Sequence, residues 1–297
     1  MSAPAPSRPP EDLALARKLA LGASLAFSGM YVCVKLLSPG VGSMEALFAR
    51  SVVGLCVCLV LLRRVGGGVR WGSWKLNLAR ATFGFLSIGG QFLALHEGGC
   101  SLSTVAFLRH AAPVWMLVFA GPYLGEWPDR RAKVAVAVGA IGTLLALRPQ
   151  GGESAWGIAV AVSAGGTAAL ALLSVRKLAA TDHPLTVVTF FMAFVALATA
   201  PFVVHELATG GLQWTQSDLA LLGLTAVLGT AGQILNTNAY RRGGAVAMAV
   251  TGLSEVLFTL LLAWTVAGDA VPPWTTFAGG GAILAAAWIA TRPRNVA

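Results

Sequence analysis

Ten apolar segments follow one another along the 297-residue chain, separated by short polar connections. Each segment is close to the ~20 residues that a helix needs to cross a lipid bilayer. The pattern therefore predicts an all-α membrane protein with ten transmembrane helices. The segments lie near residues 17–37, 44–62, 76–96, 102–123, 132–148, 155–175, 185–205, 218–239, 245–266 and 274–291.

Lysine and arginine gather in every second connection, and the connections between these have almost none. The positive-inside rule places such basic connections in the cytoplasm, so we expect a multi-pass protein of the inner membrane with both termini cytoplasmic. The first ten residues are polar and rich in proline, so the first segment should remain as a helix and not be cleaved as a signal peptide. The basic residues are Arg8, Arg17, Lys18, Arg63, Arg64, Arg70, Lys75, Arg130, Arg131, Lys133, Arg176, Lys177, Arg241, Arg242, Arg292 and Arg294.

Composition supports the membrane assignment. Hydrophobic residues make up 56% of the chain and charged residues 11%, whereas about 25% of the residues of soluble proteins are charged. The formal charge of +9 is then an orientation signal, and we expect a lipid bilayer and a small molecule as partners, with no nucleic acid. Cys33, Cys56, Cys58 and Cys100 lack the paired spacing of a metal site or a disulfide framework. We expect neither a metal nor a cofactor.

An internal repeat divides the chain into two halves. Residues 90–99 resemble residues 232–244, with a small insertion in the second copy, and residues 113–126 match residues 256–269 at equal spacing. We assign a cytoplasmic tail to 1–16, the first repeat to 17–149, the second to 150–291 and a second tail to 292–297. Because each repeat holds five spans, an odd number, the second must cross the membrane in the opposite sense. Inverted repeats of this kind occur in many secondary transporters, with the substrate site between the copies near the midplane.

Motifs for other activities are missing from the sequence. No Gly-rich loop ends in Lys-Ser or Lys-Thr, and no His, Asp or Glu cluster has metal-ligand spacing. We therefore do not expect an enzyme or an ATP-driven pump. Transport would have to run on a gradient or by exchange.

The chain resembles the drug/metabolite transporter superfamily, in its EamA-type branch of ten-helix transporters. The resemblance implies a central cavity formed by spans 1–4 and 6–9, with spans 5 and 10 outside and available for a homodimer contact. It also implies a role in the fold or in gating for Arg50 and Arg80, which could alternatively snorkel or pair with loop acids. Asp269 departs from the family's usual Glu, and the Arg109-His110 pair is not a general family feature. The matching positions are Phe48, Arg50, Arg80, Gly84, Phe92, Ala94, Leu95, residues 113–126, Gly232, Gln233, Ala239, Tyr240 and Gly268.

Arg109, His110 and Glu255 are the best functional candidates among the ionisable residues inside predicted spans. Arg109 and His110 are about a third of the way into the fourth span, and Glu255 is near the middle of the ninth. Charge is costly in the membrane, about 2.5–3.5 kcal/mol per group on insertion scales, so these residues are candidates for substrate binding. Pro113 frees the backbone carbonyl of Arg109 and suggests a kink that serves gating. The alternative is that Arg109 and Glu255 form a structural ion pair and Pro113 a packing kink.

Polar side chains on helix faces complete the predicted site. Ser28 and Tyr31 belong to one stripe of the first span, although a serine can also bond its own or a neighbouring helix. Gln233 and Asn236 share a face of the eighth span, and Gln91 is the repeat counterpart of Gln233. All five are predicted to contact the substrate, with helix-to-helix bonding as the alternative for the amides.

Glu126 and Asp269 lie at matching ends of the fourth and ninth spans. Since the repeats are inverted, the two acids should lie on opposite sides of the membrane. We expect them to be symmetric end anchors or gate latches.

The predicted function is transport of a small polar metabolite by alternating access. An amino-acid-like or zwitterionic solute fits best, because Arg109 can hold a carboxylate while Glu255 faces an ammonium group. Glu255 and His110 are the candidates for proton coupling. Alternatives are a carrier of S-adenosylmethionine or a similar nucleoside metabolite, and, from another class, a non-transporting scaffold or intramembrane enzyme.

Overall fold

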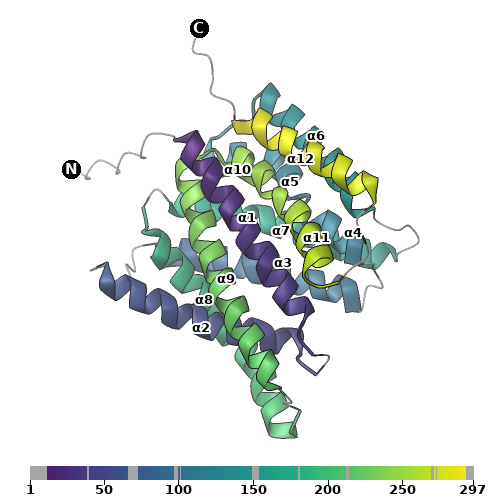
Figure 1. The fold of residues 1–297 in the computed structure, drawn as a ribbon. Helices are drawn as coiled ribbons and strands as arrows, with labels where there is room; N and C mark the ends of the chain where they lie inside the picture. The colour runs from purple at the N-terminus through teal and green to yellow at the C-terminus, as the bar shows by residue number, and fades with distance from the viewer. Residues whose placement is uncertain are drawn as a thin grey trace, which may run out of the picture.

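The computed structural model describes residues 12–38, 40–65, 73–96, 100, 102–148, 154–179, 181–211, 214–268, 271 and 273–291. Within these ranges all regular secondary structure is α-helical, which confirms the predicted class (Figure 1). The helices are α1 (Leu13–Lys35), α2 (Ser43–Arg64), α3 (Trp74–His96), α4 (Leu102–Arg109), α5 (Ala112–Leu124), α6 (Arg130–Leu147), α7 (Ala155–Leu178), α8 (Pro184–Thr209), α9 (Gln216–Arg242), α10 (Ala245–Gly252), α11 (Ser254–Thr265) and α12 (Trp274–Thr291).

Among the described residues, seven segments are long and apolar enough to cross a membrane. The predicted spans that α3, α6 and α12 occupy do not meet this criterion. Arg80 and Gln91 lower the hydropathy of α3, three basic residues begin α6, and α12 is rich in glycine and threonine. The seven segments are Leu13–Lys35, Ser43–Arg64, Thr104–Leu124, Ala155–Leu178, Pro184–Thr209, Gln216–Arg242 and Ala245–Thr265. A multi-spanning membrane protein is thus supported, and the number ten remains a prediction.

Two of the predicted spans are broken into half-helices. The fourth is divided into α4 and α5 at His110 and Ala111, and the ninth into α10 and α11 at Leu253. Pro113 stands in the first turn of α5, where its missing N–H is tolerated because that group has no partner within the helix. The second break has no proline. In the repeat alignment, nevertheless, His110 corresponds to Leu253, so the two interruptions fall at matching positions.

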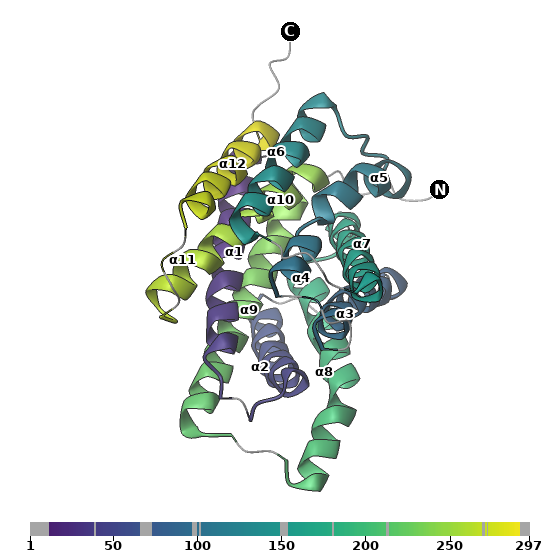
Figure 2. The same ribbon diagram turned by 90° about the vertical axis from the view of Figure 1, so that its right-hand side faces the viewer.

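Four pairs of helices make the most extensive contacts in the described part of the chain. α1 runs along α9, and α3 runs along α7, while α2 packs on α8 and α6 on α12 (Figures 1 and 2). α6 and α12 lie together at one edge of the molecule in both views. Their backbones approach so closely at Gly142 and Gly279 that a Cβ atom on Gly279 would collide with the Gly142 carbonyl oxygen. The outer faces of both helices expose large apolar side chains such as Ile141 and Trp288.

Hydrogen bonds mark two opposite ends of the bundle. At the start of α9, Asp218 accepts hydrogen bonds from the backbone N–H and the hydroxyl of Ser38, which follows α1. At the start of α3, Asn77 donates to Asp182, which follows α7, over 2.8 Å. Near the end of α9, Arg176 of α7 donates to the Tyr240 carbonyl, also over 2.8 Å. We call the two ends the Asp218 face and the Arg176 face.

Candidate functional site

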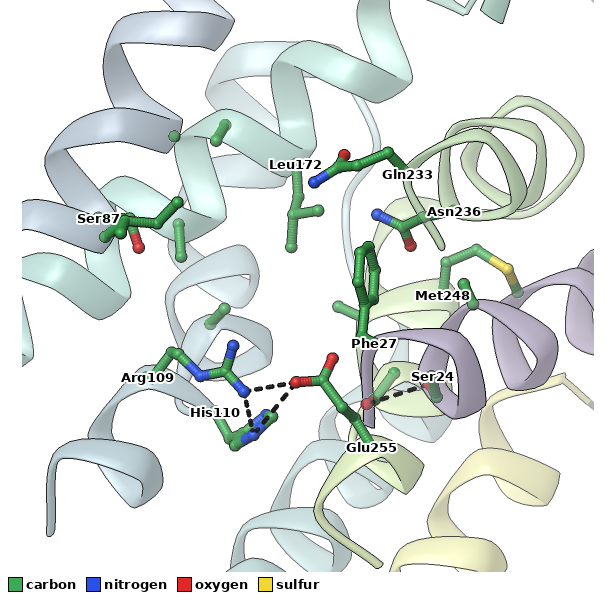
Figure 3. A pocket seen from close by; sticks show the side chains of 18 of the residues that line it. Ser24, Phe27, Ser87, Arg109, His110, Leu172, Gln233, Asn236, Met248 and Glu255 are labelled. Carbon is green, nitrogen blue, oxygen red and sulfur yellow. Dashed lines mark hydrogen bonds and ion pairs between the residues drawn. The ribbon is translucent and has the colours of Figure 1, made fainter. Parts of the chain in front are cut away.

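A cavity of about 210 Å³ lies between the two halves of the chain and is lined by every helix from α1 to α11 except α6 (Figure 3). α12 contributes no lining residue in the described part of the chain. Of the predicted substrate-binding residues, seven line this cavity. They are Tyr31, Gln91, Arg109, His110, Gln233, Asn236 and Glu255.

Arg109 and Glu255 meet across the cavity as an ion pair. Arg109 Nη2 donates to Glu255 Oε1 over 2.5 Å, and the side chains are only 22% and 12% exposed. Arg109 Nη1 also donates to the Tyr31 hydroxyl over 2.5 Å. The ion pair that the sequence left as an alternative is therefore present in this conformation. Both charges are already partnered here, so neither is free for a substrate without the pair opening.

The two helix breaks give each charge a favourable position. Arg109 is the last residue of α4, and Glu255 is the second residue of α11. A helix carries partial negative charge at its C-terminus and partial positive charge at its N-terminus. The end of α4 therefore favours the guanidinium group, and the start of α11 favours the carboxylate. These dipoles offset part of the cost of holding the charges inside the membrane.

His110 lies beside the ion pair, as Figure 3 shows. Its Nε2 is 2.9 Å from Arg109 Nη2 and 4.0 Å from Glu255 Oε1. A neutral ring with an unprotonated Nε2 can accept from Arg109. His110 is thus in reach of a proton that leaves or joins Glu255.

Ser28 holds helices together and is not among the residues that line the cavity. Its hydroxyl is 2.8 Å from the Ser24 carbonyl and 3.0 Å from the Glu255 carbonyl, and it accepts from Thr259. These bonds join α1 to α11. Carbonyls near a helix break need such partners, because the membrane interior offers no water.

The three amides differ in their partners. Gln91 donates to the Ser87 carbonyl one turn earlier, and Gln233 accepts from Arg80 Nη2 over 3.0 Å. Asn236 points toward the cavity beside Phe27, and its side chain has no hydrogen-bond partner among the described residues (Figure 3). Asn236 therefore has the most free hydrogen-bonding capacity of the three amides.

Arg50 of α2 and Arg80 of α3 line the same cavity, which the sequence did not indicate. They are only 7% and 5% exposed, so neither snorkels to a boundary, and neither pairs with an acid within the described ranges. Glycines make room for both: a Cβ on Gly229 would lie 2.9 Å from Arg50 Nε, and one on Gly84 would lie 3.3 Å from Arg80 Nη1. The spacing of Arg80 and Gly84, one helical turn apart, is the sequence signal that could have indicated this.

The residues assigned to gating lie in different places. Pro113 lines the cavity at the start of α5. Glu126 lies on the Arg176 face, where its carboxylate accepts from Arg176 Nε over 2.9 Å and from the Ala245 backbone N–H over 3.2 Å. It thus joins the ends of α5 and α7 to the start of α10. Asp269 lies outside the described residues.

A known family matches each half of the chain separately. The model of the EamA-like transporter family matches residues 15–148 and again residues 155–292. The chain belongs to the EamA-like transporter family. Two relatives, each named pseudopaline exporter CntI, come from Pseudomonas aeruginosa strains PAO1 and UCBPP-PA14. Each is 27% identical over 282 residues, which is 93% of this chain and 96% of the relative.

The likeness extends to a solved structure. A crystal structure of a protein with 17% sequence identity superimposes with a TM-score of 0.74 and covers 93% of this chain and 96% of that one. At that identity the match concerns the fold alone. Because the family and the relatives are transporters, the protein is a membrane transporter and not an enzyme.

Proposed function

We propose that this protein is a secondary active transporter that exports a small polar, amino-acid-like metabolite across the inner membrane. The observation that carries the proposal is the cavity between the two halves, which the Arg109–Glu255 ion pair crosses at two helix breaks. Transporters with inverted repeats bind their cargo in such a place, near discontinuous helices. The relatives named as exporters favour outward transport and a cargo related to pseudopaline.

In this proposal the chain forms two inverted five-helix repeats, and the cavity between them opens alternately to the two sides of the membrane. The contact of Ser38 with Asp218 joins the end of the first span to the start of the eighth. The contact of Asp182 with Asn77 joins the end of the sixth to the start of the third, at the other end of α9. The two contacts correspond to each other in the repeat, because spans 1 and 6 are counterparts and so are spans 3 and 8. They support an inverted relation, in which α1 and α7 run in opposite senses.

The ion pair provides the coupling step. A carboxylate of the cargo replaces Glu255 as the partner of Arg109, and the carboxylate of Glu255 then faces an ammonium group of the cargo. After the cargo has left on the outer side, Glu255 takes up a proton in place of the ammonium group. His110 lies close enough to pass that proton. On the cytoplasmic side Glu255 loses this proton and the pair with Arg109 forms again, so that a proton enters as a cargo molecule leaves. Proton movement and cargo movement are thereby linked.

Release of metabolites from cells tests this function. Cells that produce the wild-type chain are compared with cells that produce Arg109→Gln/Glu255→Gln at equal abundance in the membrane. The double substitution removes both charges together, so neither is left unpaired. We expect an amino-acid-like metabolite to build up in the medium of wild-type cells and to stay inside cells with the variant. Equal amounts in both media would contradict the proposal.

A further inference from the structure

Positive charge exceeds negative charge in the cavity wall. Among the described residues, the lining holds three arginines, Arg50, Arg80 and Arg109, and one acid, Glu255. Arg109 and Glu255 balance each other as an ion pair. Arg50 and Arg80 line the same cavity and are left without an acid in the part of the chain that the structure describes. A buried charge without a partner is costly, so a counter-charge is expected from outside the protein.

Several N–H donors of these two arginines are unsatisfied. Arg50 Nε and both Nε and Nη1 of Arg80 are buried with no hydrogen-bond partner in the described ranges. Arg80 uses only Nη2, which donates to Gln233, and its guanidinium group stacks 3.7 Å from the centre of the Phe191 ring. This ring contact and the hydrogen bond to Gln233 together restrict the guanidinium group. A fixed, planar fork of donors is suited to bidentate recognition of a carboxylate.

We propose that Arg50 and Arg80 form an oxyanion subsite that binds a carboxylate of the cargo, separate from the Arg109–Glu255 pair. This inference rests on the proposed transport function and narrows its cargo to molecules with a net negative charge and at least two acidic groups. One carboxylate engages Arg50 and Arg80, and a second one displaces Glu255 from Arg109. A cationic cargo such as S-adenosylmethionine would meet two unbalanced guanidinium groups and is disfavoured.

Thermal unfolding of the purified full-length protein tests the subsite. The probes are succinate and citrate, with glycerol 3-phosphate, putrescine and sodium chloride at matched ionic strength for comparison. A ligand that binds the folded state raises the unfolding midpoint. We expect succinate or citrate to raise the midpoint of the wild type, and putrescine and chloride to leave it unchanged. Stabilisation by glycerol 3-phosphate alone, or by none of the probes, would overturn a carboxylate subsite.

Variants of Arg50 separate binding from packing. Arg50→Met keeps the length of the side chain without its charge, and Arg50→Lys keeps the charge without the fork. The exposed Arg63, on the same helix, supplies the control Arg63→Gln. We expect Arg50→Met to lose carboxylate stabilisation, Arg50→Lys to need roughly 10- to 100-fold more ligand, and Arg63→Gln to match the wild type.

The protein without ligand gives the decisive contrast. Removing an unpaired buried charge should leave the midpoint of empty Arg50→Met equal to or above that of the wild type. If Arg50 served the fold instead, Arg50→Met would have a lower unfolding midpoint than the wild type or would not fold, and Arg50→Lys would bind carboxylates as the wild type does. Either of these results overturns the subsite. If metabolite release depends on Arg109 and Glu255 but no carboxylate binds, the transport function is supported and only the subsite is contradicted. Arg50-dependent binding without release would remove the transport function instead.

Discussion

Arg109 has three polar partners among the described residues, and they share two nitrogens of its guanidinium group. Nη1 donates to Tyr31, whereas Nη2 contacts Glu255 and His110. The guanidinium carbon also lies 4.8 Å from the centre of the Tyr31 ring. A lysine at this position would keep the charge but has no planar fork with which to serve these partners at once.

Arg109→Lys should therefore fold and insert but transport poorly. Loss of one charge-assisted hydrogen bond is worth about 1.5–3 kcal/mol, so we expect the apparent affinity for the cargo to fall roughly 10- to 100-fold. Transport per folded molecule, measured in proteoliposomes, checks this. A lower yield of folded protein with unchanged affinity would indicate that Arg109 serves the fold alone.

A charge swap between Arg109 and Glu255 shows whether the ion pair alone is sufficient or whether each charge must lie at its own helix end. Arg109→Glu with Glu255→Arg restores a pair but sets each charge against the dipole of its helix end. We expect the swap to recover folded protein relative to either single reversal, with transport still absent. Detergent-solubilised yield and proteoliposome transport are the two measurements. Recovery of transport would mean that the helix ends do not matter.

Glu255→Gln tests proton coupling. The amide cannot take up or release a proton, so an imposed proton gradient should no longer drive accumulation, while exchange of cargo remains measurable. The assay is uptake into proteoliposomes with and without a pH difference. If the variant still concentrates the cargo against a gradient, the coupling role belongs to His110 or to another ion.

Sequence reasoning found the charged residues but not how they are arranged. Arg109 and Glu255 stood out because charge is rare inside a span. Their contact could not be predicted, since in the repeat alignment Arg109 corresponds to Gly252 and not to Glu255. Arg50 and Arg80 were assigned to the fold or to gating because they match positions of the family. The burial of Arg50 depends on Gly229 of another helix, and the pattern of a single helix does not connect the two residues.

At the scale of helices, Glu126 is one of the acids that hold the Arg176 face together. Glu126 binds both Arg176 and the backbone of α10, and Arg176 is 2% exposed at its side chain. The contact closes the ends of α5, α7 and α9 against the start of α10. An outward or inward opening at this face must separate at least some of these elements.

Glu126→Gln should loosen this closure. The amide can keep one hydrogen bond but loses the ionic part of the contact with Arg176, so we expect a loss of about 1–2 kcal/mol in the free energy of unfolding. The shift in unfolding midpoint measures it. Glu206→Gln, at the other end of the bundle, removes an acid whose side chain makes no hydrogen bond among the described residues and serves as the control. Equal midpoints for both variants would contradict a latch at Glu126.

The half-helices illustrate what a sequence pattern can reveal about elements. Pro113 indicated the interruption between α4 and α5, because proline cannot continue the hydrogen-bond ladder. The interruption between α10 and α11 has no such marker, and Thr251, Gly252 and Leu253 are all compatible with a continuous helix. Hydrogen bonds from α1, including that of Ser24 with the Gly252 carbonyl, satisfy the backbone there. Contacts of this kind depend on tertiary packing and leave no local signal.

For the whole molecule, we expect the end of α8 and the connection between α9 and α10 to be accessible from opposite sides of the membrane. Ala208 is exposed near the end of α8, and Gly244 has open space around its Cα, so a cysteine fits at both. In a cysteine-free background, Ala208→Cys should react with a membrane-impermeant reagent from the periplasm and Gly244→Cys only from the cytoplasm. Labelling of both from one side would remove the inverted repeat.

Counterflow in proteoliposomes that contain only this protein tests most directly whether it carries a small metabolite through its cavity. Vesicles are loaded with the unlabelled metabolite found by the release experiment, and the labelled compound is added outside. This assay needs no ion gradient, so it is independent of the coupling mechanism. We predict that labelled compound accumulates transiently inside vesicles with the wild type and not with Arg109→Gln/Glu255→Gln. Equal entry into vesicles with and without the protein would contradict transport by this chain.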